Sequence, residues 1–297
     1  MRSAIILNAA RSRIINNMAK IYFLLIISIM CISCSPQVGN SISIDTSVPA
    51  QTIEASATLT FEPSVTPIPP TPTPDLINTI CSPLEGETLN SISEILTQKF
   101  IMPRPGNDDG HQGLDFAFYR RNEKIGIEGL KVHAALNGKI VAVINDRWPY
   151  GNAVIIETTL KSISPELLAR IQSPPLQPTV IPSPRVNCPA GDLPFSIDSE
   201  ERSLYLLYGH LLNPLPLIVG EEVECGQTIG EVGNTGYSSN PHLHFETRIG
   251  PSGASFDSMA YYTVQSTVSE RYNYCVWRVS NLFQLFDPML LLSAQQQ

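Results

Sequence analysis

A short alternating stretch that follows a turn rich in glycine and serine constrains this chain most strongly. It covers residues 233–246 and reads GNTGYSSNPHLHFE. Side chains repeat with a period of two along an extended strand, so His242, His244 and Glu246 share one face. The leucine and phenylalanine between them point the other way and would bury in a core. The histidine face is then free to line a cleft, although two neighbouring histidines alone are often only solvated.

Other short apolar runs predict a mainly β domain. They alternate with turns that contain glycine and asparagine, and they lie at 138–144, 153–158, 203–208 and 228–232. Residues 89–99 predict a short helix. Because no strand–helix–strand rhythm is present, we expect an antiparallel sheet with a few short peripheral helices. Residues 160–202 hold a helical patch, PELLARI, and then a Pro-rich stretch, which we interpret as an insertion between two strands.

The N-terminal residues 1–33 are typical of a signal peptide. Basic residues precede an apolar run at 21–33 (IYFLLIISIMCIS) that is too short for a comfortable membrane span. The run leads into Cys34 in a pattern that resembles a bacterial lipoprotein signal, in which this cysteine becomes the lipidated first residue. An ordinary cleaved signal and an uncleaved anchor are the alternatives. The start of translation lies at Met1 or at Met18.

Residues 34–80 are rich in Ser, Thr and Pro and have no apolar periodicity, so we expect a disordered linker. The folded domain is predicted to span 81–297. It holds four of the six cysteines, and an even number in an exported protein favours disulfides. Zinc ligation by these cysteines is disfavoured, because no two of them have a C-x₂₋₄-C spacing. Of the three connectivities, we favour Cys188 with Cys225 and Cys81 with Cys275.

Two further motifs carry residues suited to metal or acid–base chemistry. The stretch HQGLD places His111 and Asp115 four positions apart, and imidazole with carboxylate suits a zinc ion that keeps one position open. The stretch YLLYGHL ends an apolar strand in His210. Each motif also has a plainer interpretation, as a surface histidine near an aspartate or a structural histidine at a strand end. The fifth histidine, His133, lies outside the motifs.

The stretches HQGLD, YGHL and HLHFE, in that order within one β-rich domain, resemble the lysostaphin/LytM-like zinc endopeptidases of bacterial cell walls. The resemblance covers about residues 105–250 and is interrupted by the insertion. It implies that His111, Asp115 and His244 ligate one Zn²⁺.

In the same resemblance His210 and His242 are the catalytic histidines that lie beside the ion without ligating it. The Gly151-Asn152 pair before a strand also matches, and Asn152 is assigned to substrate binding.

The resemblance implies a zinc metalloendopeptidase that hydrolyses peptide cross-links or stem peptides of peptidoglycan. The alternative is a catalytically silent relative that binds peptidoglycan or activates another hydrolase; silent relatives typically lack some site residues, and none is missing here. A zinc peptidase that acts on other proteins is a third hypothesis. We expect a monomeric lipoprotein, anchored by lipid to a membrane and facing the cell wall. The formal net charge of −8 argues against nucleic-acid binding.

The insertion at 160–202 joins two strands that carry candidate site residues. Its Pro-rich content predicts a stiff, extended segment, and long loops of this kind often act as lids or binding loops. We therefore predict that it limits access to the site. A surface excursion far from the cleft is the alternative.

Overall fold

The computed structural model describes residues 76–171, 186–193, 195–196, 200–213 and 216–293. The predicted signal peptide, the lipidation site Cys34 and the linker up to residue 75 lie outside the described residues. The Ile77 amide donates a hydrogen bond to the Ser162 carbonyl at 2.7 Å, so the domain includes residues that precede Cys81. In the described part of the chain, no helix has both the length and the apolar character to cross a membrane.

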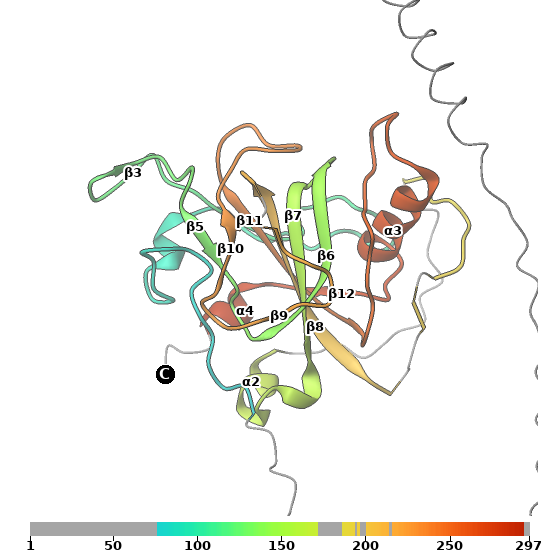
Figure 1. Cartoon of the computed structure of the whole chain (residues 1–297), viewed down its shortest axis with the longest axis horizontal. Coiled ribbons are helices and arrows are strands. Elements are labelled where there is room, and N and C mark those ends of the chain that lie inside the picture. Colours follow the sequence, from blue (N-terminus) through green and yellow to red (C-terminus); the bar gives the residue numbers. More distant parts are fainter. Residues whose placement is uncertain (1–75, 172–185, 194, 197–199, 214–215, 294–297) are drawn as a thin grey trace, which may run out of the picture. The chain divides into compact units, whose positions relative to one another are not determined.

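An antiparallel sheet of eight strands forms the centre of the domain (Figure 1). Its order is β1 (Leu96–Gln98), β2 (Leu114–Phe116), β11 (Leu243–Pro251), β8 (Arg202–Leu211), β7 (Gly151–Thr159), β6 (Gly138–Arg147) and β9 (Glu222–Val223), with β12 (Gln284–Phe286) paired to β11. Two smaller pairs join β5 (Lys131–His133) to β10 (Thr228–Glu231) and β3 (Arg120–Arg121) to β4 (Lys124–Ile125). The runs predicted as strands fall on β6, β7, β8 and β10, which confirms the mainly antiparallel fold class.

The helices are short and lie around the sheet. They are the 3₁₀ turns η1 (Ile92–Ile95) and η2 (Leu160–Ser162) and the α-helices α2 (Pro165–Arg170), α3 (Val268–Arg278) and α4 (Met289–Leu292). The helix predicted at 89–99 shrinks to η1, because the chain continues into β1 and Leu96 pairs with Phe116. The sequence analysis missed α3, which opens with a capping box: Thr267 and Glu270 each accept a hydrogen bond from the other's amide.

The two faces of the sheet pack into separate cores. On β8, Leu204 and Leu206 enter a core that helix α4 also joins. Tyr205 and Leu207 point to the opposite face and pack with Trp277 of α3. The alternation follows from the period of two along a strand. The sheet therefore presents one face to α3, and this is the face that carries the histidines.

The four domain cysteines form two disulfides, but the predicted pairing is wrong. The bonds join Cys81 to Cys225 and Cys188 to Cys275. Both Cys81 and the turn after Cys225 hydrogen-bond to the segment 134–135, with N···O distances of 2.9 and 2.8 Å, so the chain path brings these two cysteines together. Cys188 is left beside α3, where Cys275 lies.

Candidate metal centre

Strand register brings the motif residues to one place. His244 of β11 lies opposite Asp115 of β2 on one side and Gly209 of β8 on the other. His210 follows with a φ of 60°, a left-handed conformation that is uncommon outside glycine and that often occurs at functional sites. His111 lies just before β2. Stretches that are far apart in the sequence therefore converge because their strands are neighbours.

His111, Asp115 and His244 form a compact cluster of ligand atoms. Asp115 Oδ1 lies 3.0 Å from His111 Nε2 and 2.8 Å from His244 Nδ1. One ligand atom from each of the three residues lies within 4.8 Å of the others. Two imidazole nitrogens and a carboxylate oxygen form a donor set that zinc accepts while it keeps a fourth position open. The residues therefore fit a zinc ion.

The second ring nitrogen of each of these two histidines is held by an oxygen of the protein. His111 Nδ1 is hydrogen-bonded to the Lys99 carbonyl at 2.9 Å. His244 Nε2 is hydrogen-bonded to Glu246 Oε1 at 3.1 Å. Metal-bound histidines have such partners, because the partner fixes the ring orientation and the tautomer.

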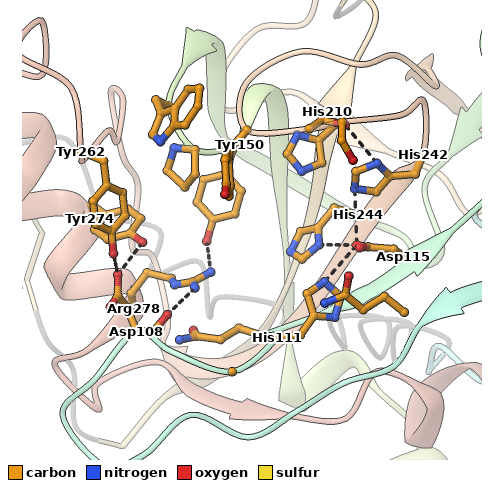
Figure 2. Close-up of a pocket in the computed structure, with 18 residues that line it drawn as sticks. Asp108, His111, Asp115, Tyr150, His210, His242, His244, Tyr262, Tyr274 and Arg278 are labelled. Atoms are coloured by element: carbon orange, nitrogen blue, oxygen red, sulfur yellow. Dashed lines mark hydrogen bonds and ion pairs between the residues drawn. The ribbon is translucent and has the colours of Figure 1, made fainter. Parts of the chain in front are cut away.

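His210 and His242 stand beside the cluster (Figure 2). Their ring centroids are 4.6 Å apart, and His242 Nε2 lies 3.5 Å from Asp115 Oδ1. His210 Nδ1 is hydrogen-bonded to the Thr235 carbonyl at 2.7 Å and His242 Nδ1 to the Asn240 carbonyl at 2.8 Å. In each ring the fold holds Nδ1 and leaves Nε2 available to a reacting group.

The surroundings set the protonation of the centre. Burial lowers the pKa of His210 to about 3, so this imidazole is neutral at neutral pH. Burial alone would raise the pKa of Asp115, but hydrogen bonds with His111 and His244 outweigh it and hold the pKa well below the usual range. Burial would likewise lower the pKa of His244, yet hydrogen bonds to Asp115 and Glu246 raise it to about 9. A bound cation would displace the proton that His244 then carries.

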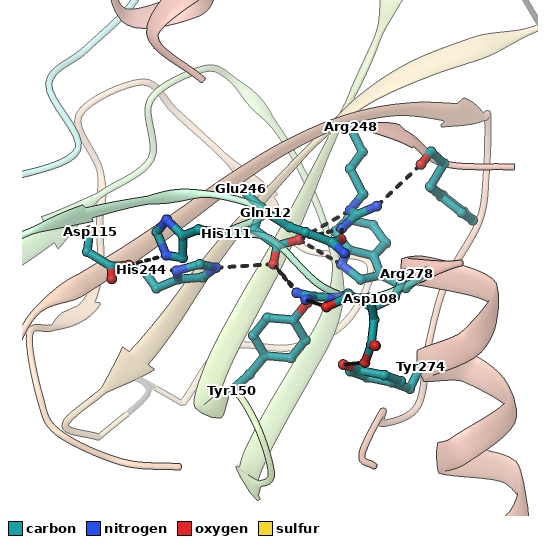
Figure 3. Close-up of polar contacts among 12 residues, drawn as sticks. Asp108, His111, Gln112, Asp115, Tyr150, His244, Glu246, Arg248, Tyr274 and Arg278 are labelled. Carbon is teal, nitrogen blue, oxygen red and sulfur yellow. Dashed lines mark hydrogen bonds and ion pairs between the residues drawn. The ribbon is translucent and has the colours of Figure 1, made fainter. Parts of the chain in front are cut away.

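Glu246 is the centre of a polar network behind His244 (Figure 3). The side chain is fully buried. Besides His244, its oxygens accept hydrogen bonds of 2.8–3.0 Å from Tyr150, Trp277, Arg248 and Arg278. Burial raises the pKa of Glu246, but the two guanidinium groups outweigh it and hold the pKa well below its usual range. The network thus fixes an anion against His244. Period-two alternation predicts the shared face of His244 and Glu246, whereas the donors on α3 could be found only with that helix.

The histidines open into a cleft of about 830 Å³. The cleft runs from the histidines past Tyr150 to Asp108, Tyr262 and Tyr274 (Figure 2). Trp148 and Tyr237 form an aromatic pair in its lining, with ring centroids 4.9 Å apart. The cleft can therefore contact a peptide on both sides of a bond placed at the histidines.

Two residues that the sequence analysis discussed lie away from this cleft. Asn152 is absent from its lining, and its amide donates to the carbonyls of Leu211 and Leu212 at 3.2 and 3.0 Å. His133 lies on β5, where Nδ1 is 3.4 Å from Thr228 Oγ1. Both side chains are engaged within the fold.

The described part of the insertion packs on the α3 side of the sheet and does not line the cleft. Phe195 joins the second core with its ring centroid 5.6 Å from that of Phe256, and the Asn187 carbonyl accepts a hydrogen bond from Tyr261 at 3.0 Å. The disulfide from Cys188 fastens the insertion to α3. Limited access through the insertion stays a prediction, which now bears on residues beyond the described ones.

Comparison with solved structures finds several bacterial peptidases. The catalytic domain of lysostaphin from Staphylococcus simulans matches at 20% identity and a TM-score of 0.36, over 69% of this chain and 98% of that one. A zinc-containing peptidase from Vibrio cholerae matches at 22% identity and a TM-score of 0.29, over 51% of this chain and 32% of that one. The catalytic domain of EnpA from Enterococcus faecalis matches at 20% identity and a TM-score of 0.31, over 54% and 85%.

A comparison with protein families gives a match that is centred on the histidines. It covers residues 196–257, which contain His210, His242 and His244, while His111 and Asp115 precede it. The matched model is that of Peptidase family M23, and it supports a place for this chain among the M23 peptidases.

Proposed function

We propose that this chain is a zinc-dependent endopeptidase that hydrolyses peptide cross-links or stem peptides of bacterial peptidoglycan. One observation carries the proposal: His111, Asp115 and His244 offer ligand atoms within 4.8 Å of one another, with two further histidines beside them. The match of residues 196–257 to a peptidase family supports the reaction class. The resemblance of HQGLD, YGHL and HLHFE to lysostaphin/LytM-like enzymes supports peptidoglycan as the substrate.

In this proposal His111 through Nε2, Asp115 through Oδ1 and His244 through Nδ1 hold the ion. A bound zinc ion lowers the pKa of a water molecule to about 7 and polarises a peptide carbonyl. The protein keeps the donors in place through the Lys99 carbonyl and the Glu246 carboxylate, which hold the second nitrogens of the two rings.

His210 and His242 supply the proton transfers. A neutral imidazole with a free Nε2 accepts the proton of the attacking water, and the resulting imidazolium returns a proton to the leaving amine. The second ring donates a hydrogen bond to the oxyanion that develops on the carbonyl. Burial keeps His210 neutral at neutral pH, and the Nδ1 contacts with Thr235 and Asn240 fix the direction of both rings.

We also propose a place for the enzyme in the cell envelope. The sequence supports a signal peptide at 1–33, lipidation at Cys34 and a linker up to about residue 80 as a tether between membrane and domain. Such a tether would hold a monomeric enzyme beside the cell wall. Mass spectrometry of the mature N-terminus tests the anchor, since a diacylglycerol on Cys34 is expected and an unmodified N-terminus contradicts it.

Digestion of purified peptidoglycan tests the proposed reaction. The mature chain, loaded with one equivalent of zinc, is incubated with the polymer, and the released fragments are identified by mass spectrometry. We expect new peptide termini with intact glycan strands, and their loss in His210→Ala and His242→Ala. A chain that holds zinc and releases no peptide termini would contradict the proposal and favour the silent relative.

A further inference from the structure

We propose that the end of the cleft opposite the histidines is a subsite for a primary ammonium group of the substrate, and that Asp108 recognises it. The inference rests on the proposed function for the substrate class, a peptide that carries a free amine. Asp108, Tyr262 and Tyr274 line the same cleft as the histidines and lie across Tyr150 and Arg278 from them (Figure 2). A group bound at Asp108 therefore belongs to the same substrate molecule as a bond held at the histidines.

The Asp108 carboxylate has neutral partners. Its Oδ2 accepts hydrogen bonds from the Tyr274 hydroxyl at 3.1 Å and from the Tyr262 hydroxyl. Within the described ranges, no lysine or arginine forms an ion pair with this carboxylate, and Oδ1 accepts no hydrogen bond. Arg278 approaches the backbone instead: its Nη2 donates to the Asp108 carbonyl at 3.2 Å, while its Nη1 donates to Glu246 at 3.0 Å.

The neighbouring aspartate shows the contrast. Asp109 forms an ion pair with Arg104 at 2.5 Å and accepts a hydrogen bond from the Arg104 amide at 2.9 Å. It does not line the cleft. Two adjacent carboxylates thus differ in the property that matters here, because one is neutralised outside the cleft and the other faces the cleft with only hydroxyl partners.

Aromatic rings complete the recognition chemistry. The rings of Tyr262 and Tyr274 meet edge to face with centroids 6.0 Å apart, and Tyr261 stacks on Tyr274 at 5.2 Å. A carboxylate among aromatic rings favours an ammonium ion, through a charge-assisted hydrogen bond and through attraction to the ring faces. The same carboxylate repels an acidic group of a substrate.

The carboxylate is fixed before a substrate arrives. Tyr274 belongs to α3 and is 1% exposed, and burial raises the pKa of its hydroxyl well above the usual range, so it remains a donor. Tyr262 is 56% exposed and borders solvent. Binding an amine here therefore costs little reordering of the protein.

Stem peptides offer this chemistry at two positions, an α-amine at the N-terminus and the side-chain amine of a diamino acid. The test uses L-alanyl-γ-D-glutamyl-L-lysyl-D-alanine and its two singly acetylated forms, one blocked at each amine. Binding to the zinc-loaded mature chain is measured by calorimetry. We expect one acetylation to weaken binding by about 10-fold or more, as for the loss of a charge-assisted hydrogen bond. The sensitive position identifies which amine the subsite takes.

Asp108→Asn should weaken binding of the unblocked peptide by the same factor and remove the difference between it and the sensitive acetylated form. Asp109→Asn is the matched control, since it removes the same charge outside the cleft and should leave the preference unchanged. Tyr262→Phe removes one exposed hydroxyl and should give a smaller loss, which guards against misfolding of Asp108→Asn.

The proposal is overturned if neither acetylation weakens binding, if Asp108→Asn keeps the preference, or if the unblocked peptide does not bind. Peptidoglycan digestion separates this result from the proposed function. An enzyme that digests the polymer without an Asp108-dependent preference has the proposed function and lacks the subsite. A chain that shows the preference and digests nothing has the subsite and lacks the proposed function.

Discussion

The histidine end of the cleft and the Asp108 end rest on different kinds of structure. Backbone pairing of β2, β11 and β8 places Asp115 and His244 side by side with the start of the turn at His210. Asp108 comes from a loop, and side-chain hydroxyls hold its carboxylate. The proposed chemistry is thus placed by strand register, whereas the proposed recognition depends on contacts between separate segments.

Arg278 joins the two ends. Its Nη1 donates to Glu246, which holds His244, and its Nη2 donates to the Asp108 carbonyl. It lies on α3, outside residues 196–257 that match the peptidase family. The two ends can nevertheless be separated by substitutions, because the contacts that hold each one are different.

The largest effect is expected at the histidine end, from His244→Ala. Loss of a ligand from a three-residue set should reduce bound zinc from one equivalent to a trace and abolish hydrolysis. Elemental analysis of the purified variant measures the metal. His133→Ala is the control, because this histidine lies on β5 away from the cleft, and it should keep its zinc. Full zinc occupancy in His244→Ala would contradict the ligand assignment.

His210→Ala and His242→Ala should separate catalysis from metal binding. Each variant is expected to keep one zinc and to lose about 10²-fold or more in kcat, the usual scale for loss of acid–base catalysis. The rates come from release of peptide termini and the zinc from elemental analysis of the same samples. Zinc that is lost together with activity would mean that these rings are ligands.

Glu246→Gln should have an intermediate effect at the histidine end. The carboxylate orients His244, and removal of such a partner typically lowers metal affinity by about 10–100-fold. Zinc affinity is measured by competition with a chelator. Glu157→Gln is the matched control, since Glu157 is also buried and accepts a hydrogen bond from Tyr205 at 3.0 Å on another strand. Equal zinc affinity in the two variants would remove the orienting role of Glu246.

The smallest effect on zinc is expected from the double substitution of Cys188→Ser and Cys275→Ser. Loss of this disulfide should lower the free energy of unfolding by about 2–5 kcal/mol and weaken peptide binding at the Asp108 end, because Cys275 adjoins Tyr274 on α3. Zinc affinity should stay the same. The pair Cys81→Ser with Cys225→Ser should destabilise the fold without the loss in peptide binding. If zinc affinity falls in the first variant, the two ends are not independent.

Local patterns in the sequence explain how much could be predicted. Alternation predicts strands such as β8, and the motifs single out the five residues that the structure brings to one point. The disulfide pairing was wrong because it depends on the path of the chain past residues 134–135. The donors Trp277 and Arg278 were missed with α3, although the Thr267 and Glu270 capping box signals the start of that helix.

The central claim is that three residues hold one zinc ion and two histidines stand beside it. Anomalous diffraction at the zinc edge from crystals grown with zinc tests this directly. We expect a single peak at about 2.0–2.2 Å from His111 Nε2, an Asp115 oxygen and His244 Nδ1, with the Nε2 atoms of His210 and His242 outside bonding distance. A zinc ion bound by His210 or His242, or no zinc between the three residues, would contradict the account.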